Sequence, residues 1–409
     1  MLKEGTPGHA IAAIVVVNFV TVSGFGLMFP VYASFGDQIG ASTTQLAWAI
    51  AAFSLGQLLA APVTGRLSDR FGRRRVLLAS LLLGSIAYWL HGYVTSPPLL
   101  VAARFASGLA SGGFAVAFAV AADISTRDGR ARVMGIVAAG FSAGIIFGPA
   151  IGGVIGALVD ESAAFATVCR VSALLNLLAA GSTALFLPET RRPATLRPAA
   201  GPPRTAPAAD RDLLARPDFI VPVLLGFGAM GCVAMMEGTF VVYAKRFLSL
   251  SALEIGLVFA LMGISSVLVQ ALLAGRLATR FGEYRLLLGA MAVQITGLAL
   301  LGVFDRLPVV VVGTVAMSIG YALLTPAVTA LASFAADEET QGSAQGVVQG
   351  ASSLGRVLGP AAAGPIYDGL GPAMPFLTAS GLLLLVLALA LLWRPSVRAA
   401  PAPSAAASA

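Results

Sequence analysis

The chain has 409 residues, of which 57% are hydrophobic and 11% are charged, and its mean hydropathy is +0.88. A soluble domain carries about 25% charged residues, so this composition excludes an ordinary water-soluble fold. The net charge of +7 does not indicate a nucleic-acid-binding protein, because the arginines are scattered between apolar runs rather than gathered on one face.

Long apolar runs follow one another along the first half of the chain. A helix needs about 20 apolar residues to cross the roughly 30 Å of hydrocarbon in a bilayer. The runs are continuous rather than alternating, which favours helices over a membrane β-barrel. The first run is longer than the core of a signal peptide, and we interpret it as a retained helix. Six membrane-spanning helices are expected, at about residues 10–33, 44–64, 75–95, 98–122, 132–158 and 163–187.

A basic stretch rich in proline and alanine, residues 188–217, predicts a solvated linker. Six further helices are expected after it, at about residues 218–243, 253–274, 285–303, 308–335, 342–367 and 371–393. The sequence therefore predicts an all-α membrane protein whose twelve transmembrane helices form two pseudo-symmetric six-helix bundles. These bundles would span residues 1–187 and 218–394, and residues 395–409 would form a disordered tail.

The positions of Lys and Arg predict the orientation in the membrane. Most of the 26 Lys and Arg residues fall in alternate connections, among them the segments 66–75, 127–132 and 276–285 and the linker. Basic connections face the cytoplasm, so both termini are expected there. The two cysteines, Cys169 and Cys232, lie far apart in apolar surroundings, and neither a disulfide nor a metal site is predicted.

Two segments recur in the second half at nearly the same shift. GRLSDRFGRRRVLL (65–78) aligns with GRLATRFGEYRLLL (275–288), and GIIFGPAIGG (144–153) aligns with GRVLGPAAAG (355–364). Internal duplication is typical of transporters in which two bundles rock about a site near the middle of the membrane. The repeat therefore favours a transporter over a receptor or a structural membrane protein.

The first copy of the basic segment carries an acid, Asp69, where the second copy has Thr279. A carboxylate here can accept hydrogen bonds from Arg66, Arg70 or a neighbouring helix end. This predicts a charged latch that favours the outward-facing state, and the alternative is a basic anchor that only fixes topology. The candidate latch residues are Gly65, Arg66, Asp69, Arg70, Gly72, Arg73, Arg74, Asp123 and Arg132.

Small residues are concentrated in the fifth expected helix, where they permit a neighbouring helix to approach closely. The proline among them removes a helical hydrogen bond and bends the helix. Two interpretations remain open: a seal between the two bundles, or close packing with no further role. The residues are Gly144, Gly148, Pro149, Gly152 and Gly153.

Three ionisable residues lie inside expected helices, where charge is costly and usually functional. Glu237 is the only carboxylate away from a helix end, and Arg104 and Arg356 are the two intramembrane cations. We expect Glu237 to take up a proton or to contact a cationic substrate, with Arg104 or Arg356 tuning its acidity. The alternative is that Glu237 lies near the outer mouth and is hydrated.

Aromatic, Met and polar residues along the helices would suit an amphipathic organic substrate, although most such residues in a bundle serve packing. The candidates are Asn18, Thr21, Phe25, Tyr32, Gln57, Met236, Gln270 and Tyr321.

GRLSDRFGRRRVLL resembles the signature loop of the major facilitator superfamily, and GIIFGPAIGG resembles the antiporter motif of that superfamily. Arg104, in RFASGLASGG, stands where drug exporters of the superfamily carry an arginine. The resemblance runs along the whole chain except the linker and tail, and it is nearest to the twelve-helix drug:proton antiporters. It implies proton-coupled efflux of small organic compounds by alternating access, by a monomer in the bacterial inner membrane that needs no cofactor.

The chain departs from the tetracycline exporters, because Thr21 stands where they carry an acidic residue and the ninth expected helix has no acid. These departures argue against tetracycline as the substrate. A carrier for a specific metabolite and a non-transporting membrane sensor remain as alternatives. The sequence contains no G-x-x-x-x-G-K-[ST] motif, so ATP binding is not predicted. Two histidines, His9 and His91, are too few for a catalytic or metal centre.

Overall fold

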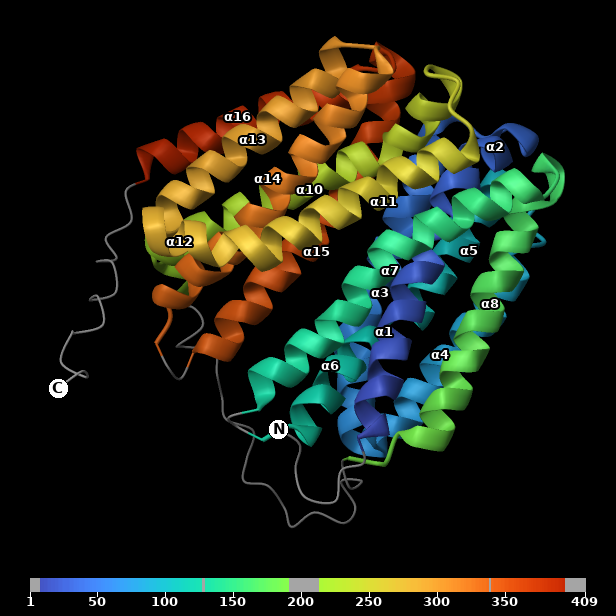
Figure 1. The fold of residues 1–409 in the computed structure, drawn as a ribbon, viewed down its shortest axis with the longest axis horizontal. Coiled ribbons are helices and arrows are strands. Elements are labelled where there is room, and N and C mark those ends of the chain that lie inside the picture. The colour runs from blue at the N-terminus through green and yellow to red at the C-terminus, as the bar shows by residue number, and fades with distance from the viewer. Residues whose placement is uncertain (1–7, 127–128, 191–212, 338–339, 394–409) are drawn as a thin grey trace.

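The structure is a computed structural model that describes residues 8–126, 129–190, 213–337 and 340–393. Two helical bundles lie side by side (Figure 1), the first formed by the blue-to-green part of the chain and the second by the yellow-to-red part. Most of the expected linker (188–217) lies outside the described residues, and so does all of the expected tail (395–409). The described residues form helices and no strand.

The N-terminal bundle contains the six expected helices, and two of them are divided. The first is divided before Pro30, which cannot donate a helical hydrogen bond, and the fourth is divided at Gly112. The helices are α1 (His9–Gly26), α2 (Phe29–Gln38), α3 (Thr43–Phe71), α4 (Arg73–His91), α5 (Pro97–Ala110), α6 (Gly113–Ile124), α7 (Arg130–Leu158) and α8 (Glu161–Phe186).

The C-terminal bundle also follows the expected order. Its second rod is continuous but contains the π-helical segment η2, and Gly371, with a φ of 114°, ends the rod before the last. The elements are α10 (Pro217–Arg246), α11 (Ala252–Val269), η2 (Gln270–Ala274), α12 (Gly275–Phe281), α13 (Glu283–Val303), α14 (Leu307–Phe334), α15 (Gln341–Leu370) and α16 (Met374–Leu392).

When divided helices are counted together, the described residues form twelve rods at the expected places, and the predicted all-α membrane fold is confirmed. Ten rods are long and apolar enough to cross a membrane. α15 is long enough but is not among the ten, because Gln and Ser residues and Arg356 interrupt it. Polar residues in membrane helices face the bundle interior or a water-filled cavity, so α15 is expected to line the interior of the protein.

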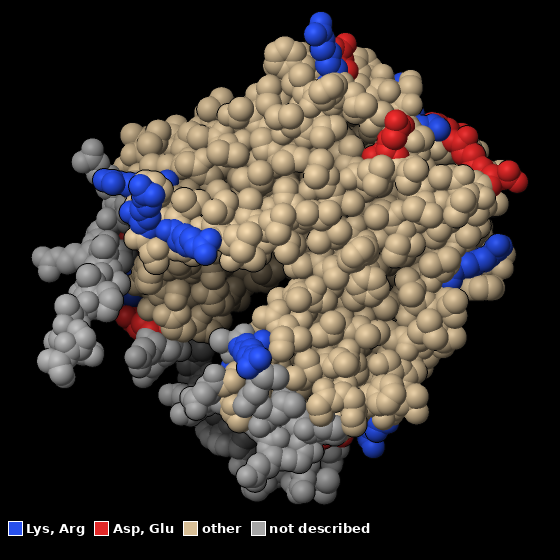
Figure 2. All heavy atoms as spheres, in the orientation of Figure 1, with Lys and Arg blue, Asp and Glu red and all other residues tan. Residues whose placement is uncertain are grey.

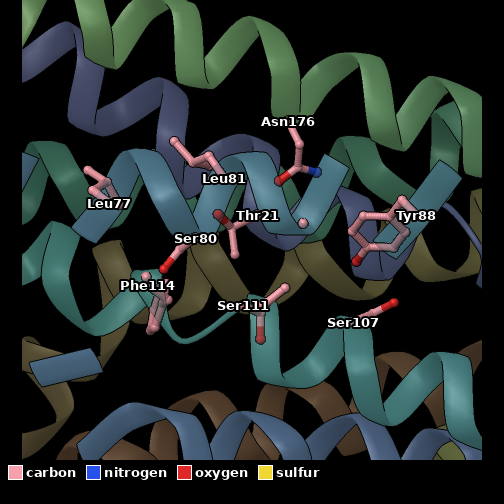
Figure 3. Close-up of a pocket in the computed structure, with 12 residues that line it drawn as sticks. Thr21, Leu77, Ser80, Leu81, Tyr88, Ser107, Ser111, Phe114 and Asn176 are labelled. Atoms are coloured by element: carbon pink, nitrogen blue, oxygen red, sulfur yellow. The ribbon is translucent and has the colours of Figure 1, made fainter. Parts of the chain in front are cut away.

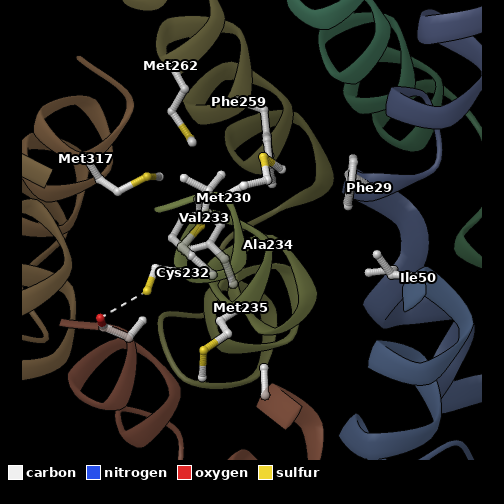
Figure 4. Close-up of a cluster of buried hydrophobic side chains, with 14 of the residues drawn as sticks. Phe29, Ile50, Met230, Cys232, Val233, Ala234, Met235, Phe259, Met262 and Met317 are labelled. Atoms are coloured by element: carbon white, nitrogen blue, oxygen red, sulfur yellow. Dashed lines mark hydrogen bonds between the residues drawn. The ribbon is translucent and has the colours of Figure 1, made fainter. Parts of the chain in front are cut away.

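The bundles meet along two helix pairs, α7 with α11 and α3 with α15. Buried apolar side chains fill this contact, and the ring of Phe29 on α2 stacks on that of Phe259 on α11 with centroids 5.0 Å apart. Figure 4 shows Phe29 and Ile50 facing the methionine-rich core of the second bundle. The same view includes Cys232, whose thiol donates to the carbonyl of Ala379 at 3.2 Å.

Candidate functional site

Ion pairs join the two bundles at one end of the molecule, which we call the closed end. Arg246, the last residue of α10, pairs with Asp37 of α2 at 2.5 Å, and Lys245 pairs with Glu161 of α8 at 2.9 Å. All four side chains are partly exposed, so each pair contributes about 1 kcal/mol or less. Figure 2 shows acidic side chains gathered at this end and a hollow between the two halves of the visible face.

The glycine-rich segment of α7 contacts both bundles. A Cβ at Gly148 would lie 3.0 Å from the Cα of Ser23 on α1, within the same bundle. A Cβ at Gly153 would lie 2.8 Å from the carbonyl oxygen of Ala252 and 3.2 Å from the Cα of Gly256, both on α11. The packing interpretation therefore applies to Gly148, and the seal interpretation applies to Gly153.

The second copy of this segment occupies the equivalent contact on the other side. Gly364 of α15 is the counterpart of Gly153, and its Cβ would lie 2.6 Å from the Cα of Thr44 on α3. One turn further on, the carboxylate of Asp368 accepts a hydrogen bond from the backbone N–H of Thr44 at 2.8 Å. The sequence repeat is thus a repeat of the contacts between bundles.

Replacing Gly153 with Ala is expected to weaken the closed end. The new methyl group would overlap α11, and overpacking of this kind costs about 1–3 kcal/mol, which is a shift in the open-to-closed ratio of roughly fivefold or more. The check is the labelling rate of a cysteine placed at Ile50, which is 2% exposed at the contact. Gly135→Ala is the control, because a Cβ at Gly135 on the same helix meets nothing within 4 Å. Equal labelling in the two variants would contradict the seal.

Arg73 is the centre of a charged network at the other end, which we call the basic end because it carries segments 66–75 and 276–285. Its guanidinium pairs with Asp69 at 3.0 Å and with Asp123 at 3.2 Å, and it donates to Ser68 at 2.6 Å. Arg73 is buried. One side chain therefore ties together the end of α3, the start of α4 and the end of α6.

The turn before Arg73 depends on Gly72, whose φ of 102° is in the left-handed region that favours glycine. The carboxylate of Glu189, just after α8, accepts hydrogen bonds from the backbone N–H groups of Arg73 at 2.7 Å and Arg74 at 3.4 Å. It thereby satisfies donors that a helix start leaves unpaired. Glu189 was not predicted, although an acid that directly follows a helix beside a basic segment was the available signal.

The expected partners of Asp69 differ from those in the structure. Arg66 and Arg70 are exposed, and Arg70 lies over the ring of Phe71 at 5.3 Å. Asp123 joins the network through Arg73, as expected, whereas Arg132 is exposed at the start of α7 and forms no ion pair among the described residues. The reason is local: the turn at Gly72 brings the buried guanidinium of Arg73 back to Asp69 near the end of α3, whereas Arg66 and Arg70 are exposed.

Arg104 lies inside the N-terminal bundle in a cage of aromatic rings. Its side chain is 1% exposed, and its guanidinium carbon lies 4.8 Å from the ring centroid of Tyr32, 5.8 Å from Phe25 and 6.0 Å from Phe53. Its Nε and Nη1 atoms have no hydrogen-bond partner among the described residues. Attraction to the ring faces compensates this cation for the hydrogen bonds that Nε and Nη1 lack.

A small cavity lies next to this cage. Figure 3 shows that its hydroxyl groups come from α1, α4 and α5, with Thr21, Ser80 and Ser107 among them. Thr21 donates to the carbonyl of Val17 in its own helix at 2.8 Å. The structure thus brings three of the expected lining residues, Thr21, Phe25 and Tyr32, into one region around Arg104.

Glu237 and Arg356 lie together in the C-terminal bundle. Glu237 is partly exposed and interacts electrostatically with Arg356, and Tyr321 interacts with both. The hydroxyl of Tyr321 donates to the sulfur of Met230 at 2.9 Å. Glu237 is nine residues before the end of α10, or roughly 14 Å along the helix. Arg356, and not Arg104, is therefore the cation beside Glu237.

The remaining candidates do not join either cluster. Asn18 is buried and donates to the carbonyl of Val137 at 3.3 Å, so it fixes α1 against α7. Met236 is fully buried in the apolar core. Gln57 is partly exposed on α3, and Gln270 is exposed at the start of η2.

Comparison with known proteins agrees with this architecture. The chain matches the Major Facilitator Superfamily over residues 14–269 and 229–409. The tetracycline resistance protein, class C, of Escherichia coli is 33% identical over 371 residues, which cover 87% of this chain and 89% of that protein. Multidrug resistance protein 2 of Bacillus subtilis (strain 168) is 28% identical over 381 residues, covering 92% and 93%.

Solved structures share the fold. The nucleoside transporter NupG has a TM-score of 0.75 at 13% identity, covering 94% of this chain and 98% of that chain. A bacterial homolog of the human lysosomal transporter Spinster, in an inward-facing and occupied conformation, has a TM-score of 0.76 at 14% identity, covering 95% and 97%. With the family match over most of its length, two repeated bundles and both repeated motifs, the chain belongs to the Major Facilitator Superfamily.

Proposed function

We propose that this protein exports small organic compounds from the cytoplasm in exchange for protons, by alternating access. The observation that carries the proposal is the arrangement of contacts. Polar contacts between the bundles join Arg246 to Asp37 and Asp368 to Thr44 at the closed end, while the Arg73 network at the basic end lies within one bundle. A carrier that opens to one side at a time needs such an asymmetry.

The basic end is the cytoplasmic end in this proposal, because Lys and Arg are enriched in cytoplasmic connections. The described conformation is then open toward the cytoplasm, where an exporter collects its cargo. Both termini lie on this side in a bacterial inner membrane. The two bundles, residues 1–187 and 218–394, work as a monomer, since the contacts described above are complete within one chain.

Glu237 is the proton-binding residue in this mechanism. A carboxyl group inside a membrane helix is neutral when protonated and strongly unfavourable when charged and unpaired, so its protonation state and the conformation of the bundle are coupled. Arg356 lies beside it and favours the charged form. Relatives described as tetracycline resistance and multidrug resistance proteins support an organic compound as the cargo.

Uptake of dyes and antibiotics into everted membrane vesicles tests the proposal. In everted vesicles the cytoplasmic face points outward, so export is seen as uptake driven by respiration. We expect uptake of at least one compound from a panel of cationic, neutral and anionic dyes, and an uncoupler should abolish it. Respiration-independent movement, or no movement of any compound, would contradict the proposal and favour a carrier for a specific metabolite or a sensor.

A further inference from the structure

A cavity lies inside the C-terminal bundle between α10, α14 and α15. One guanidinium group, from Arg356, reaches this cavity, and its other polar groups are amides and hydroxyls. The side chains that matter below are Tyr321, Thr325, Thr329, Gln349, Ser352 and Arg356.

Arg356 enters the cavity with its donors largely unused. A guanidinium carries five N–H donors, and the contact that the structure gives it is the sulfur of Met230 at 3.8 Å. Sulfur is a weak acceptor. Among the described residues Arg356 forms no ion pair. Glu237 interacts with it electrostatically but does not occupy its donors.

The packing of α15 holds Arg356 in this place. The preceding residue, Gly355, lies so close to α10 that a Cβ there would be 2.6 Å from the carbonyl oxygen of Phe227. The backbone of α15 therefore cannot rotate without a clash, and this fixes the point from which the Arg356 side chain enters the cavity. A fixed backbone lowers the ordering cost of binding an anion there.

The hydroxyl groups around Arg356 differ in whether their hydrogens are already donated to another group. Thr325 and Thr329 donate to carbonyls of their own helix, at 3.0 Å and 2.9 Å, so their oxygens are left as acceptors. Ser352 has no hydrogen-bond partner in the part of the chain that the structure describes. Its hydroxyl, the side-chain amide of Gln349 and the Arg356 guanidinium are therefore the free donors among the described lining residues. An acidic group could accept hydrogen bonds from them.

We propose that this cavity binds the acidic group of an amphipathic organic anion, such as an aryl carboxylate, on the guanidinium of Arg356. The proposal deepens the proposed function, since it names the class of cargo. A carboxylate can take two parallel N–H donors from one guanidinium, and the apolar body of the molecule would contact Leu324, Val328 and Val348 on the same wall.

A matched pair of probes tests the proposal: dansylglycine, which carries a carboxylate, and its methyl ester, which does not. Both fluoresce more strongly in an apolar site, so their dissociation constants can be measured on purified protein in dodecyl maltoside. Arg356→Gln is expected to weaken the binding of dansylglycine roughly tenfold or more. It should change ester binding less than about twofold, which also shows that the variant is folded. Arg356→Lys should retain part of the affinity.

The control is Arg170→Gln, because Arg170 is exposed on α8 in the other bundle, and it should change neither constant. Equal weakening of acid and ester, or equal affinity of both for the unaltered protein, would overturn the proposal. So would displacement of dansylglycine by phosphatidylglycerol micelles at low lipid, which would assign the guanidinium to a lipid headgroup. None of these three results would affect dye uptake into everted vesicles, so the proposed function would still stand.

Discussion

Asp69→Asn is expected to abolish most transport while leaving membrane insertion unchanged. The substitution removes one of the two carboxylates that Arg73 contacts, at 3.0 Å. Because the Asp69 carboxylate is half exposed, loss of this ion pair costs about 1 kcal/mol or less, which corresponds to a shift between two conformations of up to about fivefold. Asp69 is half exposed, so folding should be little affected. The measurement is dye uptake into everted vesicles, normalised to the amount of protein in the membrane.

Thr279→Val is the matched control for Asp69→Asn, because Thr279 stands at the same position of the second copy. Its hydroxyl donates to the carbonyl of Arg276 within the same helix at 2.9 Å, and no charge is lost. We expect normal uptake. If both variants transport normally, the basic segment is only a topological anchor. If both lose transport equally, the two copies are equivalent and the latch does not belong to the N-terminal bundle.

Glu237→Gln is expected to eliminate proton-driven accumulation of the cargo. Gln has nearly the same shape as Glu and cannot bind or release a proton at physiological pH. Cargo should still exchange across the membrane down its own gradient, because the bundles keep their contacts. Uptake into everted vesicles is measured with and without an uncoupler. The variant should take up the same amount in both conditions, as much as the unaltered protein takes up when the uncoupler is present.

The control for this prediction is Glu254→Gln. Glu254 is exposed at the start of α11, where its carboxylate accepts a hydrogen bond from the backbone N–H of Ser251 at 2.8 Å. Gln supports the same capping arrangement, so coupling should be unaffected. Gradient-driven accumulation that persists in Glu237→Gln would remove Glu237 from the mechanism.

Run length and charge alone predicted the twelve rods, because the thickness of the hydrocarbon core imposes a minimum length on each spanning helix. The breaks in the first and fourth rods were not predicted. Pro30 and Gly112 were visible in the sequence, but a membrane helix tolerates such residues when neighbouring helices satisfy its backbone. Whether a rod bends or divides there depends on packing against other helices, which a single sequence does not contain.

The candidate site was predicted less completely than the fold. Repeated segments identified Gly153, whose counterpart Gly364 makes the equivalent contact, and Asp69, the acid by which the first copy of the basic segment differs from the second. The pair Arg246–Asp37 joins residues 209 positions apart, and nothing in local spacing indicates such a contact. The sequence placed Arg104 and Arg356 in different bundles but left open which of them lies near Glu237, and Arg356 proved to be its neighbour.

The two copies of the basic segment are unequal in structure as well as in sequence. Gly72 and Gly282 both have positive φ, 102° and 80°, so both copies make the same turn between two helices. Only the first adds the Arg73 network and Glu189. The backbone turn is therefore the shared feature of the duplication, and within the described residues the charged network belongs to the N-terminal bundle.

Alternating access can be tested by measuring two distances in one protein. Spin labels at Phe71 and Phe281, which are exposed at equivalent positions of the basic end, report one distance, and labels at Leu158 and Leu370 report the closed end. The buried Cys169 and Cys232 would be replaced by Ala. When pH and cargo are varied, the account predicts that the first distance shortens as the second lengthens. Distances that stay constant, or that change in the same direction, would contradict it.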